Sequence, residues 1–150
     1  MERAIALSKE GMEKNAGGPF GAVIVKNGKI IGEGFNMVTS TNDPTAHAEM
    51  SAIRKATKKI KDFSLKGCEI YTSCEPCPMC LSAIYWARID KVYYANSKRD
   101  AAKINFDDNF IYKEFDKPKK KRKLEVKQLM RKEALVVFGE WEEKVDRVAY

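Results

Sequence analysis

The chain has 150 residues, of which 44% are hydrophobic and 33% are charged, a composition typical of one soluble globular domain. No run of apolar residues approaches the roughly 18 that a membrane span needs, and the first residues lack the uninterrupted apolar core of a secretory signal. We therefore expect a cytoplasmic protein with no membrane association. In that compartment the four cysteines would serve as metal ligands or free thiols rather than as disulfides.

The net charge of +7 is concentrated in one part of the chain. Residues 117–132, called the basic segment below, hold nine Lys or Arg side chains and one acidic residue, a net charge of +8. The remaining residues therefore carry −1, so the positive charge is not a field over the whole protein. This distribution argues against a nucleic-acid partner, although a local basic stripe can still bind phosphates.

The first part of the chain has signals for a helix and a β-hairpin. Residues 2–15 mix apolar and charged side chains at helical spacing. Residues 20–25 form an apolar strand-like run, and residues 30–37 form a second one after the tight-turn pair Asn27-Gly28. Two glycines in the second strand predict a bulge or the close approach of another backbone: Gly32 and Gly34.

Helices alternate with strands over the middle of the chain. Asp43 is a typical N-cap and Pro44 a typical first helical residue, so a helix is predicted over about 44–59. Pro76 predicts the start of a second helix, between strands at 68–73 and 90–95. After residue 95 the pattern is mostly helical, and apolar residues recur near the end at helical spacing: Phe138, Trp141, Val145 and Val148.

This order of elements predicts the fold class. Strands that alternate with helices form sheets with parallel members and right-handed crossovers. The hairpin would add an antiparallel edge to such an α/β sheet. We expect residues 1–150 to form a single domain.

Two short motifs carry the chemistry. The only histidine lies in His47-Ala48-Glu49, and Pro76-Cys77-Pro78-Met79-Cys80 follows downstream. Together they read H-x-E … P-C-x-x-C, the signature of zinc deaminases. One imidazole and two thiolates would hold a zinc ion and leave its fourth position for water, as in a catalytic site. Glu49 would then act on that water as a proton acceptor.

Other roles for these residues are weaker. A Cys-x-x-Cys pair alone could be a redox pair or half of a four-ligand zinc knuckle. Cys74 lies three residues before Cys77 and could compete as a ligand, but Cys74 and Cys68 fall on a predicted strand. We expect both to be structural. A zinc-stabilised binding module without turnover is a further alternative, although such a module has no use for Glu49.

The chain resembles bacterial guanine deaminases of the cytidine deaminase-like superfamily. The resemblance covers about residues 15–118 and is carried by four runs: GGPFGAVIV at 17–25, NDPTAHAE at 42–49, TSCEPCPMCLSAIYWAR at 72–88 and FDDNFIYKE at 106–114. The zinc motif identifies only the superfamily, whereas the Tyr-Trp-Ala-Arg and Phe-Asp-Asp stretches point to guanine deaminase. The resemblance implies a three-layer α/β/α sandwich with a central five-stranded mixed sheet.

The resemblance also implies a reaction and its residues. Guanine would become xanthine and ammonia through attack of zinc-bound hydroxide at C2. His47, Cys77 and Cys80 would bind one Zn²⁺ per subunit, and Glu49 would shuttle protons. Six residues would surround the substrate: Asn36, Asp108, Phe20, Trp86, Ala48 and Tyr150. The hydrogen-bonding chemistry of two of these residues suits guanine. One edge of guanine donates hydrogen bonds, and the carboxylate of Asp108 can only accept them. The amide of Asn36 can donate and accept, which suits a purine nitrogen or oxygen.

The C-terminal part and the substrate remain open at this level. The resemblance implies a homodimer that exchanges C-terminal helical segments, with a basic hinge at about 117–127, but folding back on the same domain is equally compatible with the sequence. A tRNA adenosine deaminase, using the basic segment to hold phosphates, is the main alternative to a guanine deaminase. Cytosine or nucleoside deamination is another within the same superfamily.

Overall fold

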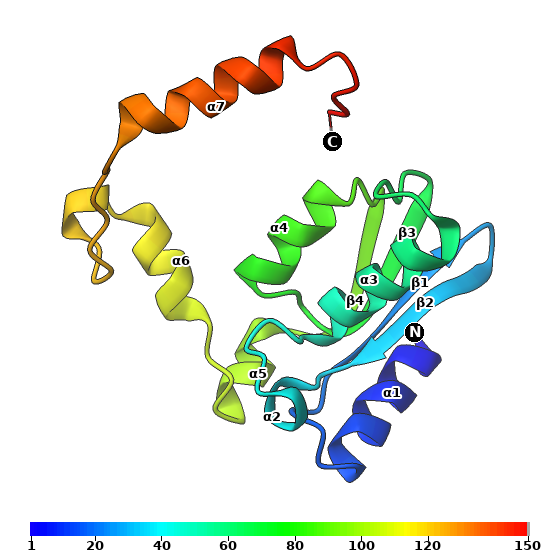
Figure 1. Ribbon diagram of the computed structural model, residues 1–150. Helices are drawn as coiled ribbons and strands as arrows, with labels where there is room; N and C mark the ends of the chain where they lie inside the picture. Colours follow the sequence, from blue (N-terminus) through cyan, green and yellow to red (C-terminus); the bar gives the residue numbers. More distant parts are fainter. Residues whose placement is uncertain (150) are drawn as a thin grey trace. The chain divides into compact units, whose positions relative to one another are not determined.

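The computed structural model describes residues 1–149, which divide into two units, Met1–Asn109 and the residues from Phe110 onward. The first unit is built around a four-stranded sheet in the order β2-β1-β3-β4 (Figure 1). Its strands are β1 (Gly21–Lys26), β2 (Lys29–Phe35), β3 (Cys68–Cys74) and β4 (Lys91–Asn96). Strand β1 is antiparallel to both β2 and β3, whereas β3 and β4 are parallel. The predicted mixed α/β sheet with its antiparallel hairpin is confirmed.

Helices cover both faces of this sheet, as Figure 1 shows. Helix α1 (Glu2–Glu13) lies on one face, where Ala4 and Leu7 pack against Val23 of β1. Helices α3 (Ala48–Ile60) and α4 (Pro78–Trp86) lie on the other face, over the larger core cluster. Because neighbours along a strand point to opposite faces, alternate residues of β1 serve the two cores. The first unit is therefore a three-layer α/β/α sandwich.

The predicted features of the hairpin are present. Asn27 and Gly28 both have positive φ angles, 49° and 73°, the combination that a two-residue hairpin turn needs. A β-bulge interrupts the pairing of β1 with β2 after Ile24. A side-chain carbon added at Gly34 would lie 2.6 Å from Ser51 Cβ and 2.8 Å from the Ala48 carbonyl oxygen. The glycine thus lets the first turn of α3 lie directly on β2.

Two helix starts were predicted too early. The helix expected from residue 44 begins at Ala48, and the one expected from Pro76 begins at Pro78. Asp43 does not cap a helix, because its side chain accepts hydrogen bonds from the backbone N–H and the hydroxyl of Thr45, at 2.8 and 2.7 Å. This local turn leaves residues 44–47 outside the helix. Short helix α2 (Val38–Thr41) precedes them.

The described residues form four strands where five were expected. After β4 the chain turns into helix α5 (Lys98–Lys103), whose N-cap Ser97 and Asp100 form a capping box. No strand follows in the described remainder of the chain. Strand β4 therefore forms an edge of the sheet, and its residues are mostly exposed.

The second unit contains helices without a core of their own. Helix α6 (Asn109–Asp116), the 3-10 turn η1 (Lys119–Lys121) and helix α7 (Arg131–Glu143) have no buried residue among those described. The helix predicted from Phe138 and Trp141 is present, but it ends before Val145 and Val148. No helix among residues 1–149 is long and apolar enough to cross a membrane.

Candidate metal centre and active site

The two sequence motifs meet at one edge of the sheet. Strands β2, β3 and β4 all end there, and helices α3 and α4 both begin there (Figure 1). His47 is the N-cap of α3 and Cys77 is the N-cap of α4, both in extended backbone conformation. Cys80 follows in the first turn of α4. Because helix N-termini attract negative charge, this edge favours ionised thiols and carboxylates.

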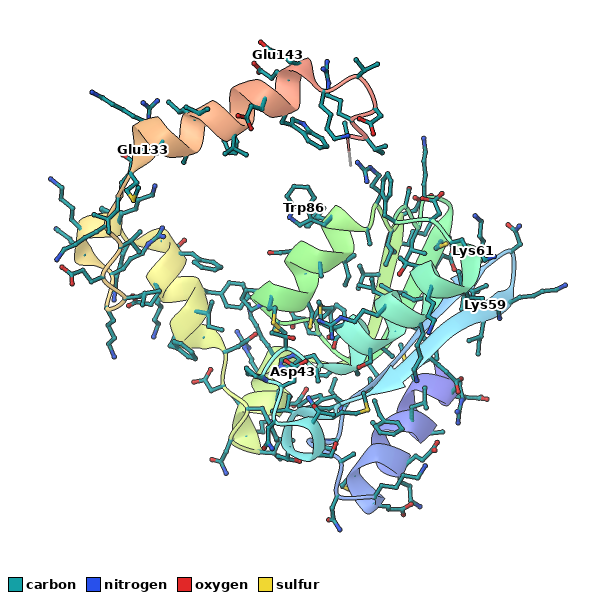
Figure 2. All side chains as sticks on the ribbon, in the orientation of Figure 1. Asp43, Lys59, Lys61, Trp86, Glu133 and Glu143 are labelled. Atoms are coloured by element: carbon teal, nitrogen blue, oxygen red, sulfur yellow. The ribbon has the colours of Figure 1, made fainter. Side chains whose placement is uncertain are left out.

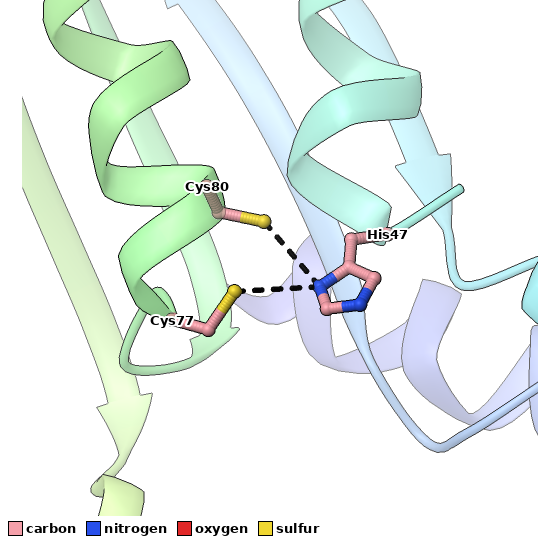
Figure 3. Close-up of side chains that lie close together, drawn as sticks. All are labelled: His47, Cys77 and Cys80. Atoms are coloured by element: carbon pink, nitrogen blue, oxygen red, sulfur yellow. Dashed lines mark hydrogen bonds between the residues drawn. The ribbon is translucent and has the colours of Figure 1, made fainter. Parts of the chain in front are cut away.

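His47, Cys77 and Cys80 form a cluster with metal-ligand geometry (Figure 3). The Nδ1 atom of His47 lies 3.6 Å from the Cys77 sulfur and 3.4 Å from the Cys80 sulfur. Usual zinc–sulfur and zinc–nitrogen bond lengths with tetrahedral angles place such atoms about 3.6 Å apart. The ligand atoms of the three side chains all lie within 4.8 Å of one another, close enough to hold one zinc ion.

Charges in the cluster favour a cation. The pKa of Cys77 is lowered to about 4, first by a hydrogen bond from the Cys80 thiol and then by His47. The pKa of Cys80 is raised by the neighbouring Cys77 and by burial, and the pKa of His47 is raised by its hydrogen bond with Cys77. Without metal, one thiol is thus ionised while the other keeps its proton. A bound Zn²⁺ would replace that proton and hold both sulfurs as thiolates.

Glu49 is placed for proton transfer beside this cluster. It lies in the first turn of α3, two residues after His47, and only 7% of its surface is exposed. Burial raises its pKa above the usual range, and the charge of Cys77 raises it further. A carboxylate with a raised pKa accepts and returns a proton near neutral pH more readily than an exposed one. Glu49 is therefore suited to the predicted shuttle role.

The other two cysteines lie outside the metal cluster. The Cys74 thiol contacts the backbone oxygen of Ser97 at 3.6 Å, and burial raises its pKa to about 11. Cys68 is fully buried in the larger core cluster, and burial raises its pKa as well. Among the described residues, the group whose ligand atoms lie together contains His47, Cys77 and Cys80 but not Cys74, which argues against Cys74 as a competing ligand.

The side chain of Asn36 has a fixed orientation. It follows β2 directly and is only 5% exposed. Its Oδ1 atom accepts hydrogen bonds from the backbone N–H groups of Gly18 and Val38, both at 3.2 Å. The Asn36 backbone N–H donates to Phe20, and the next residue donates to Ala46, beside His47. With its oxygen occupied, the Asn36 amide can only donate to a ligand.

An aromatic pair and an aspartate lie on the same side. The rings of Phe20 and Phe106 meet edge to face, with centroids 4.9 Å apart. Asp108 lies two residues further, and its pKa is raised first by burial and then by the charge of Cys77. Phe106 was not predicted as a site residue, because a single aromatic residue in a loop gives no periodic signal.

Glu75 is a further residue that the sequence reasoning missed. Its Oε2 accepts a hydrogen bond from the Lys98 backbone N–H at 3.0 Å, and its own N–H donates to the Asn96 oxygen at 2.8 Å. These bonds tie the turn that carries Cys77 to the start of α5. Sequence could not reveal this role, since the partners are backbone groups about twenty residues away.

Three further residues were predicted to contact the substrate, and their positions relative to the metal cluster differ. Ala48 is the first residue of α3, where backbone N–H groups have no partner within the helix. Trp86 ends α4, so the length of the helix separates it from Cys77, and 64% of its surface is exposed (Figure 2). The structure does not bring Trp86 to the cluster of its own chain. Tyr150 lies outside the described residues. The roles of these three in substrate binding stay predictions.

Comparisons with known proteins agree with this geometry. Residues 1–96 match the profile of the cytidine and deoxycytidylate deaminase zinc-binding region. The chain is 53% identical over 150 residues to guanine deaminase of Bacillus subtilis, covering 100% of this chain and 96% of that protein. The X-ray structure of guanine deaminase from Bacillus subtilis superposes with a TM-score of 0.96 at 54% identity, covering 99% of this chain and 95% of that one. A tRNA-specific adenosine deaminase from Aquifex aeolicus is 45% identical over 92 residues, covering 61% of this chain and 60% of that protein.

Proposed function

The chain belongs to the zinc-dependent cytidine and deoxycytidylate deaminase family, and from this membership we propose that it deaminates guanine to xanthine and ammonia. The observation that carries the proposal is the similarity to a guanine deaminase along the whole chain, at 53% identity. Similarity to the tRNA-specific adenosine deaminase from Aquifex aeolicus covers only 61% of the chain. The higher identity and the full coverage of the guanine deaminase therefore favour the free purine over the RNA.

The site supplies complementary groups for guanine. Guanine presents two hydrogen-bond donors along one edge, the ring N1–H and the exocyclic amine, and a carboxylate such as Asp108 can only accept. The amide of Asn36, with its oxygen held by Gly18 and Val38, donates to a purine oxygen or nitrogen. Phe20 and Phe106 offer apolar ring faces beside it. These contacts would orient C2 of the ring toward the metal cluster.

Proton transfer through Glu49 completes the reaction. His47, Cys77 and Cys80 would hold one zinc ion per subunit, and that ion would make a water molecule nucleophilic at neutral pH. Glu49 accepts the proton that this water loses as its oxygen bonds to C2 of guanine, and it passes the proton to a ring nitrogen. Glu49 then carries the water's second proton to the amine as the C2–N bond breaks. Ammonia leaves, and the new C2 oxygen remains as the carbonyl group of xanthine.

Ammonia release from a panel of substrates tests the proposal. Guanine should be deaminated, whereas guanosine, adenine, cytosine and an adenosine-containing tRNA hairpin should release little or no ammonia. Release from the hairpin alone would overturn the substrate and favour a tRNA adenosine deaminase. If zinc-loaded protein releases ammonia from none of the five substrates, the zinc-stabilised binding module is favoured.

We extend the proposal to a homodimer that exchanges C-terminal segments. The second unit exposes large apolar side chains, including Leu129 at 81% and Phe138 at 69%. Helices that bury nothing do not offset the conformational entropy lost on folding. In the first unit, edge strand β4 exposes Tyr93 and Tyr94. A second copy offers matching surfaces to both, in the symmetric manner of most soluble oligomers.

Complementation between two inactive variants tests the exchange. Glu49→Gln lacks the proton shuttle, and Tyr150→Ala lacks the predicted closing residue. If Tyr150 enters the partner's site, each mixed dimer contains one complete site, and co-expression should restore about a quarter of wild-type activity under random pairing. If the segment folds back on its own chain, the mixed dimers stay inactive. Light scattering would establish the dimer itself.

The proposed compartment is the cytoplasm. All four cysteines are free, and Cys77 and Cys80 must remain thiols to bind zinc. A reducing compartment keeps them in that state. A fusion to a fluorescent protein, imaged in cells, would test this localisation.

A further inference from the structure

The basic segment has no part in the proposed reaction, and it lies beyond the residues that match the family profile, 1–96. Within it, Lys119, Lys120 and Lys121 form the 3-10 turn η1, which Pro118 precedes as N-cap. Lys123 follows one residue later. All four lysines are exposed. The segment is thus a short turn that displays consecutive ammonium groups.

Contacts with the end of α6 build this turn. The Arg122 guanidinium donates to the backbone oxygens of Lys117 and Phe115, at 3.1 and 3.0 Å. The Glu114 carboxylate accepts from the backbone N–H of Lys123 at 2.7 Å and from the Lys117 side chain at 2.5 Å. Arg122 and Glu114 therefore fold the chain back over the end of the helix. Helix C-termini favour cations, so the arginine also stabilises α6.

The four displayed lysines form no ion pair within the described part of the chain. Two nearby carboxylates pair with other lysines, Glu114 with Lys117 and Glu125 with Lys127, and Asp116 pairs with none of the four. Among residues 1–149, no ion pair includes any of the four lysines. An unbalanced group of cations at this spacing attracts a ligand that carries several negative charges close together.

We propose that the basic segment is a binding site for single-stranded nucleic acid, held through its phosphates. A 3-10 helix has three residues per turn, so successive lysines of η1 point in three directions, which suits a flexible strand better than the fixed phosphate rows of a duplex. Lysine is a point charge that needs no particular phosphate orientation. Residues 119–123 contain no aromatic side chain to stack on bases, so the site selects no sequence.

An anionic membrane is a poorer fit to the same charges. Membrane-surface elements combine basic residues with an apolar face on one helix. Residues 119–123 contain no apolar side chain, and the exposed apolar residues that follow in the basic segment lie outside any helix: Leu124, Val126, Leu129 and Met130. Nucleic acid needs only the charges, and the overall −1 of the remaining chain repels it weakly.

Binding of a fluorescent oligouridylate of about 20 nucleotides tests the site, measured by anisotropy on the full-length protein. Uracil has no exocyclic amine, so this RNA is not a deamination substrate, and excess guanine should not displace it. With four phosphate contacts, affinity should fall about 50-fold between 50 and 200 mM salt. The triple variant Lys119→Gln, Lys120→Gln and Lys121→Gln should bind at least about tenfold more weakly, with a salt slope near that of one contact. Its turnover of guanine should equal that of the wild type.

A second triple variant controls for net charge. Lys58→Gln, Lys59→Gln and Lys61→Gln remove the same three charges from exposed positions at the end of α3, where Figure 2 labels Lys59 and Lys61. This variant should keep most of the affinity. Equal losses in both variants, or no binding by the wild type at 50 mM salt, would overturn the proposal. Tighter binding to vesicles of anionic phospholipid than to the RNA would overturn it as well.

Discussion

The two units of this chain differ in how much of their surface the chain itself buries. The first unit, Met1–Asn109, places two core clusters on opposite faces of a sheet and holds the metal ligands at the starts of α3 and α4. The second unit has helices of similar length but no buried residue among those described. The candidate metal ligands therefore lie in the unit whose packed core fixes their positions. The second unit is built from local contacts.

Removing the proton shuttle is the sharpest test of this division. Glu49→Gln keeps the size of the side chain and its buried position, so zinc content should be unchanged. Turnover of guanine should fall by about 10²–10⁴, the usual contribution of a general acid–base residue. The matched change in the second unit, Glu140→Gln, alters an exposed residue and should leave turnover unchanged. Metal analysis and steady-state kinetics would check both, and substantial activity in Glu49→Gln would disprove the shuttle role.

Removing the Asn36 donor should have the next largest effect. Asn36→Asp keeps an oxygen facing the N–H groups of Gly18 and Val38 but removes the amide hydrogens that we propose donate to guanine. The loss of one hydrogen bond to guanine should weaken transition-state binding by about 1–3 kcal/mol and lower kcat/KM accordingly. Thermal unfolding should change much less. A variant with wild-type kinetics would show that Asn36 is only a structural residue at the end of β2.

A glycine-to-alanine change in each unit tests how tightly that unit is packed. Gly34→Ala forces a carbon against Ser51 and the Ala48 backbone, so unfolding free energy should fall by about 1–3 kcal/mol. At Gly139 in α7, an added carbon meets nothing within 4 Å. Gly139→Ala should therefore stabilise the helix by up to about 1 kcal/mol. Denaturant unfolding would measure both, and a destabilised Gly139→Ala would indicate that this face is covered in the assembled protein.

The smallest expected effect comes from surface ion pairs. Arg3 donates to Glu33 at 3.0 and 2.7 Å, which joins α1 to β2 and lowers the pKa of Glu33 below its ordinary value of 4.5. Because the folded pKa is lowered, the pair stabilises the protein above pH 4.5 and loses this effect as pH falls through the folded pKa. Arg3→Met should cost about 0.5 kcal/mol at pH 7, since the pair is partly exposed.

The difference in stability between the wild type and Arg3→Met should disappear at acidic pH. Thermal melts at several pH values would show it, and a difference that persists well below pH 4.5 would exclude the ion pair as its cause. In the second unit, the Glu125–Lys127 pair is largely exposed on both sides. Lys127→Met should therefore leave the stability unchanged at every pH.

Sequence predicted the site better than the boundaries of the elements around it. The metal ligands and Glu49 were recognisable because their spacing is local and each motif occupies one helix start. The helix start at Asp43 was wrong because a local turn with Thr45 competes with capping, which spacing does not reveal. The fixed orientation of Asn36 was not predictable either. It depends on the backbone N–H of Gly18, 18 residues earlier in the chain, which only the fold brings to Asn36.

The exposed turn of the basic segment has a consequence for the lifetime of the protein. A protease that cleaves after lysine or arginine needs an accessible stretch of chain, and turns outside a core are preferred sites of nicking. Residues 119–123 offer five consecutive cleavable bonds within the second unit. One cut there would separate the end of the chain from the deaminase centre. A nucleic acid bound to the same lysines would shield those bonds, so its abundance would set the rate at which the enzyme is degraded.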